Sequence, residues 1–305
     1  MNDCIPLIAQ QMRELVLRWF TVRPLAHFAE LFIEEKLRES FKFGQLTVIH
    51  YKMFGGAKDE VYQAAAAVEL FVLGSDMLDD LQDQDAPDKP WMQVPAATAI
   101  HIASSLITLS QQAMLHCTED NDLRIVLVEL MNTQMLAAAN GQMLDIMNSI
   151  MDEPSYLEMV KQKSSPLLLL ACMAGVMLSG QPWNAVVAEY AIEIGIAAQL
   201  RNDIRDLMRW DDKSDFLQRK RTLLTMYLVE SLGEDDKWIR EYFEGRMTHE
   251  DVVLNKGHFV EVCERTGTLL YGSVMSRIHY NRFEELLHSL QEAGPWKSDF
   301  LQILN

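Results

Sequence analysis

Apolar residues recur every three to four positions along most of the chain, which is the period of an α-helix. This pattern predicts helices over roughly residues 5–20, 24–40, 58–83, 95–117, 121–150, 154–179, 182–210, 221–231 and 267–291. Ala, Leu, Met, Glu and Gln, which favour helix, dominate these segments, and no segment shows the alternation of a strand. The sequence therefore predicts an all-α protein of about ten helices.

Length and composition favour one domain. The chain has 305 residues, 49% of them hydrophobic, and we find no internal repeat, low-complexity tract or flexible linker. A single helical domain over residues 1–305 is therefore expected. The net charge of −17 argues against nucleic acid and against anionic membrane surfaces as partners.

Targeting signals are not recognisable in the sequence. The start, Met1 to Cys4, lacks a basic segment, and the longest apolar run, Pro166 to Leu178, is too short to span a bilayer. The four cysteines are scattered, without metal or disulfide spacing. We therefore expect a reduced cytoplasmic protein with no transmembrane segment.

Two acidic clusters lie about 120 residues apart, each at helical spacing after an apolar segment. On a helix, residues three and four apart share a face. Carboxylates on one face repel each other unless a cation lies between them, and Mg²⁺ prefers oxygen ligands. The first cluster is Asp76, Asp79, Asp80 and Asp83, and the second is Gln199, Asn202, Asp203 and Asp206.

Each cluster falls at the C-terminal end of a predicted core helix. Two such helices side by side would place both clusters at one mouth of a bundle, above an apolar interior. Gln142 and Asp145 continue the inner face of another helix, although a solvated helix end is the alternative. Pro166 is expected to kink its helix and aim Lys163 inward, and the alternative is a surface lysine near a bend.

These motifs resemble those of the trans-isoprenyl diphosphate synthase family. Asp79-Asp80-x-x-Asp83 matches the first aspartate-rich motif, and Gln199-x-x-Asn202-Asp203-x-x-Asp206 matches the second, with Asn202 in place of an aspartate. Further matches are Gly141-Gln142-x-x-Asp145, Lys163-Ser164 and Lys220-Arg221-Thr222-Leu223. The resemblance covers roughly residues 20–230, and together the motifs are highly specific.

The resemblance implies a fold and a set of roles. It implies an isoprenoid-synthase-type bundle around a central apolar cavity, a homodimer, and about three Mg²⁺ ions bound with the diphosphate of an allylic substrate. The implied metal ligands are Asp79, Asp80, Asp83, Asn202, Asp203 and Asp206. The implied catalytic residues are Asp79, Asp80, Asp83, Asp203 and Lys163, and the implied substrate-binding residues are Lys163, Lys220, Gln142, Gln199, Asp76, Phe71 and Ser75.

The chain departs from the family pattern at the residues that would bind the diphosphate of a second substrate, isopentenyl diphosphate. The family's G-G-K-x-x-R-P is reduced to Gly55-Gly56-Ala57-Lys58, and a loop from Gln84 to Trp91 replaces an expected arginine pair. An anionic co-substrate needs cationic partners. The resemblance therefore favours the branch that transfers a geranyl or farnesyl group to a tryptophan of a small pheromone-precursor peptide in bacterial quorum sensing. Residues 45–56 and the loop Asp85 to Trp91 are candidates for contacting the peptide.

Other functions remain open at this point. A chain-elongating polyprenyl diphosphate synthase would consume isopentenyl diphosphate through a rewired site. A terpene cyclase would tolerate Asn202 in its metal site. A non-catalytic partner subunit of a synthase would have damaged metal motifs, whereas both motifs here are largely intact.

Overall fold

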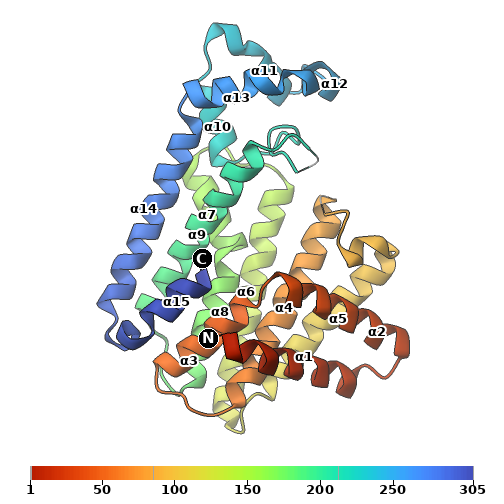
Figure 1. Ribbon diagram of the computed structural model, residues 1–305, viewed down its shortest axis with the longest axis vertical. Coiled ribbons are helices and arrows are strands. Elements are labelled where there is room, and N and C mark those ends of the chain that lie inside the picture. Colours follow the sequence, from red (N-terminus) through yellow and green to blue (C-terminus); the bar gives the residue numbers. More distant parts are fainter. Residues whose placement is uncertain (1, 85, 212, 305) are drawn as a thin grey trace. The chain divides into compact units, whose positions relative to one another are not determined.

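The computed structural model describes residues 2–84, 86–211 and 213–304, and these residues form helices and no strands (Figure 1). The all-α prediction is confirmed. The α-helices are α1 (Ile5–Trp19), α2 (Arg23–Glu39), α3 (Lys42–Met53), α4 (Glu60–Asp83), α5 (Ala96–Leu115), α6 (Asn121–Ile146), α7 (Glu153–Lys163), α8 (Ser165–Leu178), α9 (Ala185–Leu207), α10 (Leu223–Glu230), α11 (Lys237–Phe243), α12 (His249–Val252), α13 (Lys256–Arg265), α14 (Thr268–Ser289) and α15 (Lys297–Leu304). The 3-10 helices are η1 (Asn2–Cys4), η2 (Pro90–Gln93), η3 (Glu234–Asp236), η4 (Val253–Asn255) and η5 (Gln291–Trp296).

The long helices follow the predicted segments, and the differences have physical causes. Helix α3 was not predicted because its residues from Gly44 to Tyr51 are all buried, so no amphipathic period is visible. The segment predicted over residues 154–179 is interrupted at Ser164, and Pro166 lies in the first turn of α8. A proline is tolerated there because the first amide groups of a helix have no intrahelical partner.

The described residues form two compact units. Unit 1 comprises Met1–Leu136, Leu167–Ala191 and Leu286–Asn305, and unit 2 comprises Ala137–Pro166 and Ile192–Glu285. Helices α6, α8, α9 and α14 contribute residues to both. The organisation of residues 1–305 as one domain stays a prediction.

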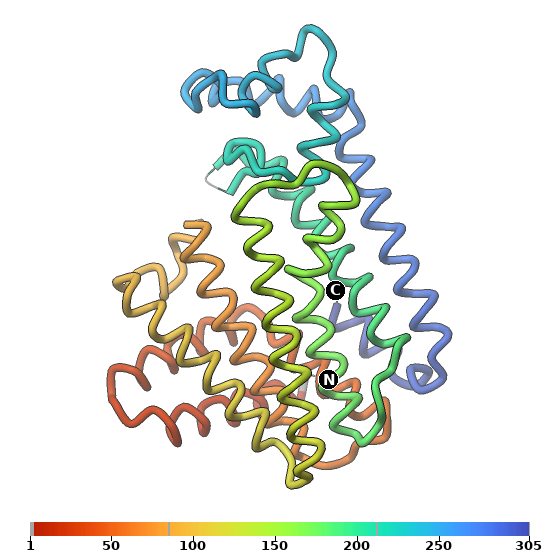
Figure 2. The backbone as a smooth tube through the Cα atoms, turned by 180° about the vertical axis from the view of Figure 1, so that it is seen from behind, coloured from red at the N-terminus to blue at the C-terminus, as the bar shows by residue number. Residues whose placement is uncertain are grey.

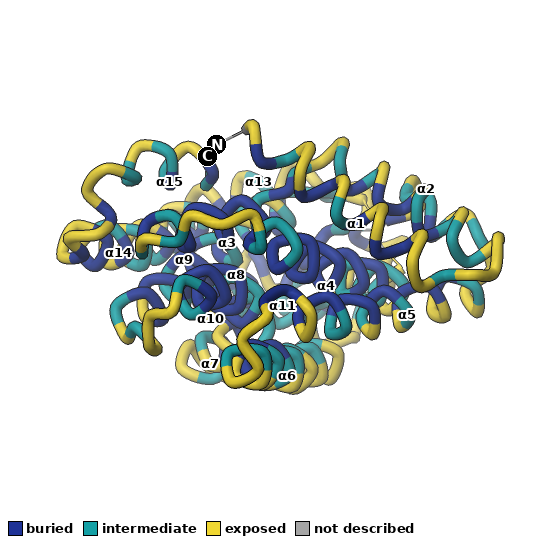
Figure 3. The backbone as a smooth tube through the Cα atoms, turned by 90° about the horizontal axis from the view of Figure 1, so that it is seen from below, coloured by how far each residue is buried: buried dark blue, intermediate teal, exposed yellow. Residues whose placement is uncertain are grey.

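Helix α4 is the core of unit 1. It contacts α5 most extensively and also contacts α3 and α1, and Figures 1 and 2 show α4 and α5 side by side. Its residues from Ala64 to Gly74 are buried, as the dark blue of α4 in Figure 3 shows. By length and composition α4 is apolar enough to cross a membrane, but 72% of its apolar window is buried inside the protein. That burial is typical of a core helix.

Glu69 is a buried carboxylate in the middle of α4. Its Oε1 accepts a hydrogen bond from the Gly44 backbone N–H at 2.6 Å, while its Oε2 is buried with no partner among the described residues. Burial raises its pKa to about 7 from an ordinary value of 4.5, although Lys36 opposes this shift. At a pH between 4.5 and about 7, Glu69 is therefore mostly protonated in the folded protein and mostly ionised in the unfolded chain.

We expect Glu69→Gln to stabilise the protein at pH 8 and to change its stability little near pH 4. Because the folded-state pKa is raised, this group favours folding at low pH, and that contribution is lost as the pH rises from about 4.5 to 7. The upper limit of the loss is about 3 kcal/mol. Melting temperatures across this pH range check it, with the exposed Glu129→Gln as control. An unchanged pH profile in Glu69→Gln would contradict it.

Unit 2 is built on two buried clusters. One includes Tyr156, Ile196 and Leu200, which join α7 to α9. The other includes Leu207, Phe216 and Phe259, with the Phe216 and Phe259 rings stacked at 4.3 Å. These clusters anchor the apolar face of α9 close to its C-terminal end, where the second acidic cluster lies.

Candidate active site

The first acidic cluster occupies the final turns of α4. Asp79, Asp80 and Asp83 are half-buried. The helix ends directly after them at Gln84, whose φ of 57° lies in the left-handed region. The C-terminus of a helix carries the negative end of its dipole, so carboxylates there are repelled by the helix end and by one another. This position favours the binding of a cation.

Lys36 of α2 supplies a buried positive charge beside this cluster. Its Nζ lies 2.9 Å from Asp76 Oδ2, and its side chain is 7% exposed. Burial alone would lower the pKa of Lys36, but the carboxylates of Asp76 and Glu69 raise it overall, so Lys36 stays protonated. Asp76 is thus ion-paired within the protein, and its part in substrate binding stays a prediction.

Trp91 fixes the orientation of Asp80. Trp91 lies in η2, and its indole N–H donates a hydrogen bond of 2.8 Å to Asp80 Oδ2. The ring is buried edge-on against Phe32 at 5.7 Å, and Lys89 Nζ lies 5.3 Å from its centroid. The loop predicted to contact a peptide therefore also holds a carboxylate of the first motif. Asp85, which that prediction included, lies outside the described residues.

Phe71 and Ser75 lie one to two turns before Asp79. Phe71 is buried and Ser75 is half-buried, and their part in substrate binding stays a prediction. The neighbouring Gly74 has a structural reason to be small, because a Cβ there would come within 2.8 Å of Ile107 Cγ1 on α5. The absence of a side chain at Gly74 thus allows α4 and α5 to pack closely.

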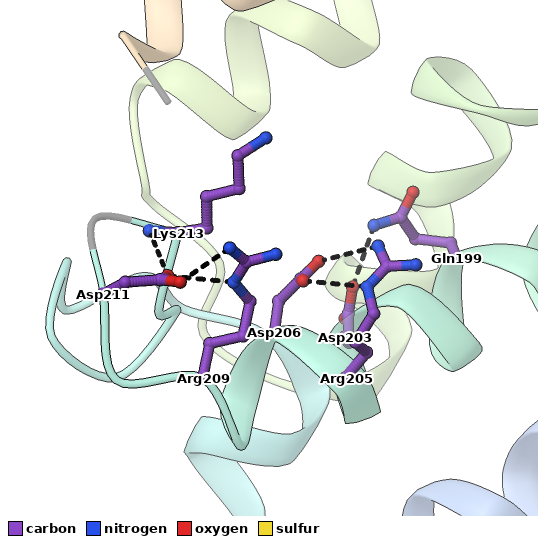
Figure 4. Close-up of polar contacts among 7 residues, drawn as sticks. All are labelled: Gln199, Asp203, Arg205, Asp206, Arg209, Asp211 and Lys213. Atoms are coloured by element: carbon purple, nitrogen blue, oxygen red, sulfur yellow. Dashed lines mark hydrogen bonds and ion pairs between the residues drawn. The ribbon is translucent and has the colours of Figure 1, made fainter. Parts of the chain in front are cut away.

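The second acidic cluster lies at the C-terminal end of α9. Asp203 is 3% exposed; its Oδ1 accepts a hydrogen bond of 2.8 Å from the Gln199 amide, and its Oδ2 accepts one of 2.6 Å from the Tyr156 hydroxyl (Figure 4 shows Gln199 and Asp203). Asp206 is half-buried and pairs with Arg205 at 3.2 Å, whereas Asn202 is exposed. The Asp203 carboxylate is therefore held in one orientation.

Further buried charge surrounds Asp203. Burial raises its pKa, which the hydrogen bonds from Tyr156 and Gln199 partly oppose. Asp215, in the loop after α9, is 6% exposed, and burial together with the charge of Asp203 raises its pKa well above the usual range. Each of these two buried carboxylates makes ionisation of the other less favourable, and a cation bound between them would offset this repulsion.

Asp145 joins the two lysines predicted to bind diphosphate. Its Oδ2 lies 2.5 Å from Lys163 Nζ and 3.2 Å from Lys220 Nζ. Burial would raise the pKa of Asp145, but the two lysines lower it overall. Gly141 permits this arrangement, because a Cβ there would lie 2.2 Å from the backbone nitrogen of Lys163. The predicted inward aim of Lys163 fits this contact.

Each unit thus gathers its own part of the predicted site. Unit 1 holds Phe71, Ser75, Asp76, Asp79, Asp80 and Asp83 on α4. Unit 2 holds Gln142, Lys163, Gln199, Asn202, Asp203, Asp206 and Lys220. The convergence of both acidic motifs at one mouth stays a prediction, as do the individual roles of these residues.

Sequence reasoning missed Lys36, Trp91, Tyr156 and Asp215 as neighbours of the acidic motifs. Lys36 could have been recognised from the sequence, because it continues the apolar stripe of Ala29, Phe32 and Ile33. An unpaired lysine would be unfavourable on that face. Tyr156 contacts Asp203 across 47 residues, Trp91 contacts Asp80 across a loop, and Asp215 acts on Asp203 from the loop after α9, and no spacing rule reveals such neighbours.

The donor set fits a hard divalent cation bound together with a phosphate ligand. Within the part of the chain that the structure describes, no three His, Cys, Asp or Glu side chains lie close enough to hold a metal ion by themselves. Mg²⁺ is commonly bound through one or two carboxylates, with water and substrate phosphates completing its shell. Oxygen donors at the ends of α4 and α9 are suited to that mode of binding.

The chain belongs to the polyprenyl synthetase family, which its sequence matches over residues 44–256. It is therefore a prenyl-transferring enzyme, and enzymes of this family generally depend on Mg²⁺. Two curated relatives are both named tryptophan prenyltransferase ComQ. The protein from Bacillus spizizenii is 27% identical over 282 residues, which cover 92% of this chain and 98% of that protein. The protein from Bacillus subtilis (strain 168) is 28% identical over 269 residues, or 88% of each chain.

Solved structures agree on the fold. A crystal structure of a geranylgeranyl pyrophosphate synthase superposes with a TM-score of 0.86 at 19% identity, covering 99% of this chain and 98% of that one. The predicted family is therefore confirmed, and the curated relatives support placement in its ComQ-like branch.

Proposed function

We propose that this protein transfers a geranyl or farnesyl group from an allylic diphosphate to a tryptophan in a small peptide. The observation that carries the proposal is the nearly full-length similarity to tryptophan prenyltransferases. A cytoplasmic location and a part in quorum sensing, through a pheromone-precursor peptide, belong to the same proposal.

The first step is ionisation of the allylic diphosphate, in which the C–O bond breaks and its electron pair leaves with the diphosphate. When bound, about three Mg²⁺ ions would neutralise the departing charge as Lewis acids. Asp79, Asp80 and Asp83 from α4, and Asn202, Asp203 and Asp206 from α9, would hold them. Gln199 supports Asp203 by its hydrogen bond. Lys163 and Lys220 would bind the diphosphate oxygens, together with Gln142, which lies close to Asp145 in the sequence.

The second step joins the allylic cation to an electron-rich carbon of the indole, which then loses a proton. Indole is neutral, so its binding requires no cationic site, and the replacement of the arginine pair by the loop ending at Trp91 agrees with this. Phe71 and Ser75 would line an apolar chamber that excludes water from the cation.

We also propose a homodimer. Helix α6 carries exposed apolar side chains at Ile125 (63%), Val126 (40%) and Leu136 (68%) in unit 1. Contiguous exposed apolar patches, rather than single apolar residues, mark surfaces that another protein covers. Sedimentation velocity of the purified protein measures the oligomeric state directly.

The function is tested by incubating purified protein with Mg²⁺, labelled farnesyl or geranyl diphosphate, and one of two acceptors. The acceptors are isopentenyl diphosphate and a short peptide with a tryptophan close to its C-terminus. We expect label in the peptide, and none in its Trp→Phe counterpart. Label in longer diphosphates would identify a chain-elongating synthase instead, and label in a hydrocarbon would identify a terpene cyclase.

A further inference from the structure

A cavity of about 540 Å³ lies in unit 1 at the turn between α2 and α3. We call it the α2–α3 cavity. Its walls come from this turn, from the first residues of the chain and from α15, which contacts α3 (Figure 1). The polar residues that line it include Asp3, Glu39, Lys42, Gln45 and Asp299. This volume is within the range of about 300–1,000 Å³ typical of ligand pockets.

Gln45 presents a carboxamide without a protein partner at the wall of this cavity. The residue is 7% exposed, and its side-chain amide has no hydrogen bond to any residue within 2–84, 86–211 or 213–304. Its amide atoms are not among the buried side-chain atoms that lack a partner, so they keep access to the open space of the cavity. A carboxamide offers one acceptor and two donors, so its natural complement is another amide, such as the peptide group of an extended chain.

The charged groups of the cavity favour a cationic ligand. Asp3 and Asp299 form no ion pair with any described residue, whereas Glu39 is already paired with Lys89. Lys42 is the cationic side chain among the lining residues. The carboxylates of Asp3 and Asp299 thus outnumber the lysine, which leaves a net negative charge on the cavity lining.

Direct contacts connect the cavity to the first acidic motif within unit 1. Glu39 on the cavity wall pairs with Lys89, Lys89 lies over the Trp91 ring, and Trp91 donates to Asp80. In addition, Leu37 lines the cavity while the adjacent Lys36 binds Asp76. The cavity wall is thus linked through side-chain contacts to Asp80, and through adjacent residues of α2 to Asp76.

We propose that the α2–α3 cavity binds the acceptor peptide. Gln45 pairs with a backbone amide of the peptide, and Asp3 and Asp299 bind a lysine or arginine side chain in the same segment. The identity of this ligand as a substrate rests on the proposed function. The binding site itself rests on the cavity, the unpartnered carboxamide and the uncompensated carboxylates.

Binding is measured by fluorescence anisotropy without any prenyl diphosphate. The probes are a labelled dodecapeptide with one tryptophan and two lysines, and its counterpart with both lysines replaced by glutamate. We expect the lysine peptide to bind at least about tenfold more tightly. Gln45→Leu should weaken its binding about tenfold, and Asp299→Asn about threefold. Glu129→Gln, an exposed change on α6, should leave binding unchanged.

Equal binding of both peptides, or unchanged binding in Gln45→Leu and Asp299→Asn, would overturn the proposal. Loss of binding in Lys42→Gln but not in Asp299→Asn would also overturn it, because the cavity would then bind an anion. Circular dichroism separates unfolding of Gln45→Leu from loss of contact, and Asp299→Asn is a half-exposed change that keeps the site testable.

Prenyl transfer measured in parallel separates this proposal from the function. If the peptide binds through Gln45 and Asp299 but no label is transferred, the binding site stands and the function fails. If label is transferred with an unchanged KM for the peptide in both variants, the function stands and the site fails.

Discussion

Asp203→Ala should reduce prenyl transfer at least about 10³-fold while the helical fold remains intact. The Asp203 carboxylate is buried and is held by Tyr156 and Gln199, so its orientation is fixed before any ligand binds. A loss of 10³-fold corresponds to about 4 kcal/mol of transition-state stabilisation, which is reasonable for a missing metal ligand. Tyr156 is buried and would lose its partner, which costs about 1–3 kcal/mol of stability.

Arg201→Ala is the matched control, because Arg201 is exposed on the same helix α9. Steady-state rates with labelled allylic diphosphate measure the effect, and circular dichroism and a thermal melt verify the fold. Asp79→Ala, at the end of α4, should show a comparable loss. Full activity in both aspartate variants would remove the metal-binding assignment.

Periodicity predicted the long helices because these helices are amphipathic or end in recognisable signals. Helix α4 was found with the first acidic cluster at its end, and α9 was found with the second. Helix α3 was missed because a helix buried on nearly every side has no polar face to reveal its period. The short helices α11 and α12 offer too few turns for a pattern to emerge.

The spacing of acidic residues predicted which carboxylates share a helix face, but not how they are held. Trp91 contacts Asp80 across a loop, and Tyr156 contacts Asp203 across 47 residues of sequence. Such partners are selected by tertiary packing, which single-sequence periodicity does not contain. The same limit applies to the α2–α3 cavity, whose walls come from both ends of the chain.

The presence of glycine at positions 55 and 56 has two possible explanations. In the sequence they resemble the remains of a diphosphate-binding motif. In the structure Gly55 has a φ of 92° and helps to end α3, while a Cβ on Gly56 would lie 2.4 Å from the Tyr51 ring. The positive φ of Gly55 and the close approach of the Tyr51 ring to Gly56 therefore explain why both positions are glycine.

Removal of both Lys163 and Lys220 should weaken diphosphate binding about 100-fold. Both ammonium groups contact Asp145 Oδ2, so the carboxylate keeps two cations together in unit 2. Charge-assisted hydrogen bonds to phosphate oxygens are among the stronger polar interactions, and each lysine should contribute about tenfold. Calorimetric titration of Lys163→Gln/Lys220→Gln with inorganic diphosphate and Mg²⁺ measures the change. Lys161→Gln, exposed on the same helix α7, is the control.

Asp145→Asn distinguishes a binding role of these lysines from a purely structural one. If the ion pairs only hold α6 and α7 together, then Asp145→Asn and Lys163→Gln should both lower the melting temperature and leave diphosphate affinity unchanged. If the lysines bind diphosphate, Asp145→Asn frees them from an internal competitor and should maintain or tighten binding, whereas Lys163→Gln weakens it. Opposite effects of the two variants on affinity can arise only when the lysines reach the ligand.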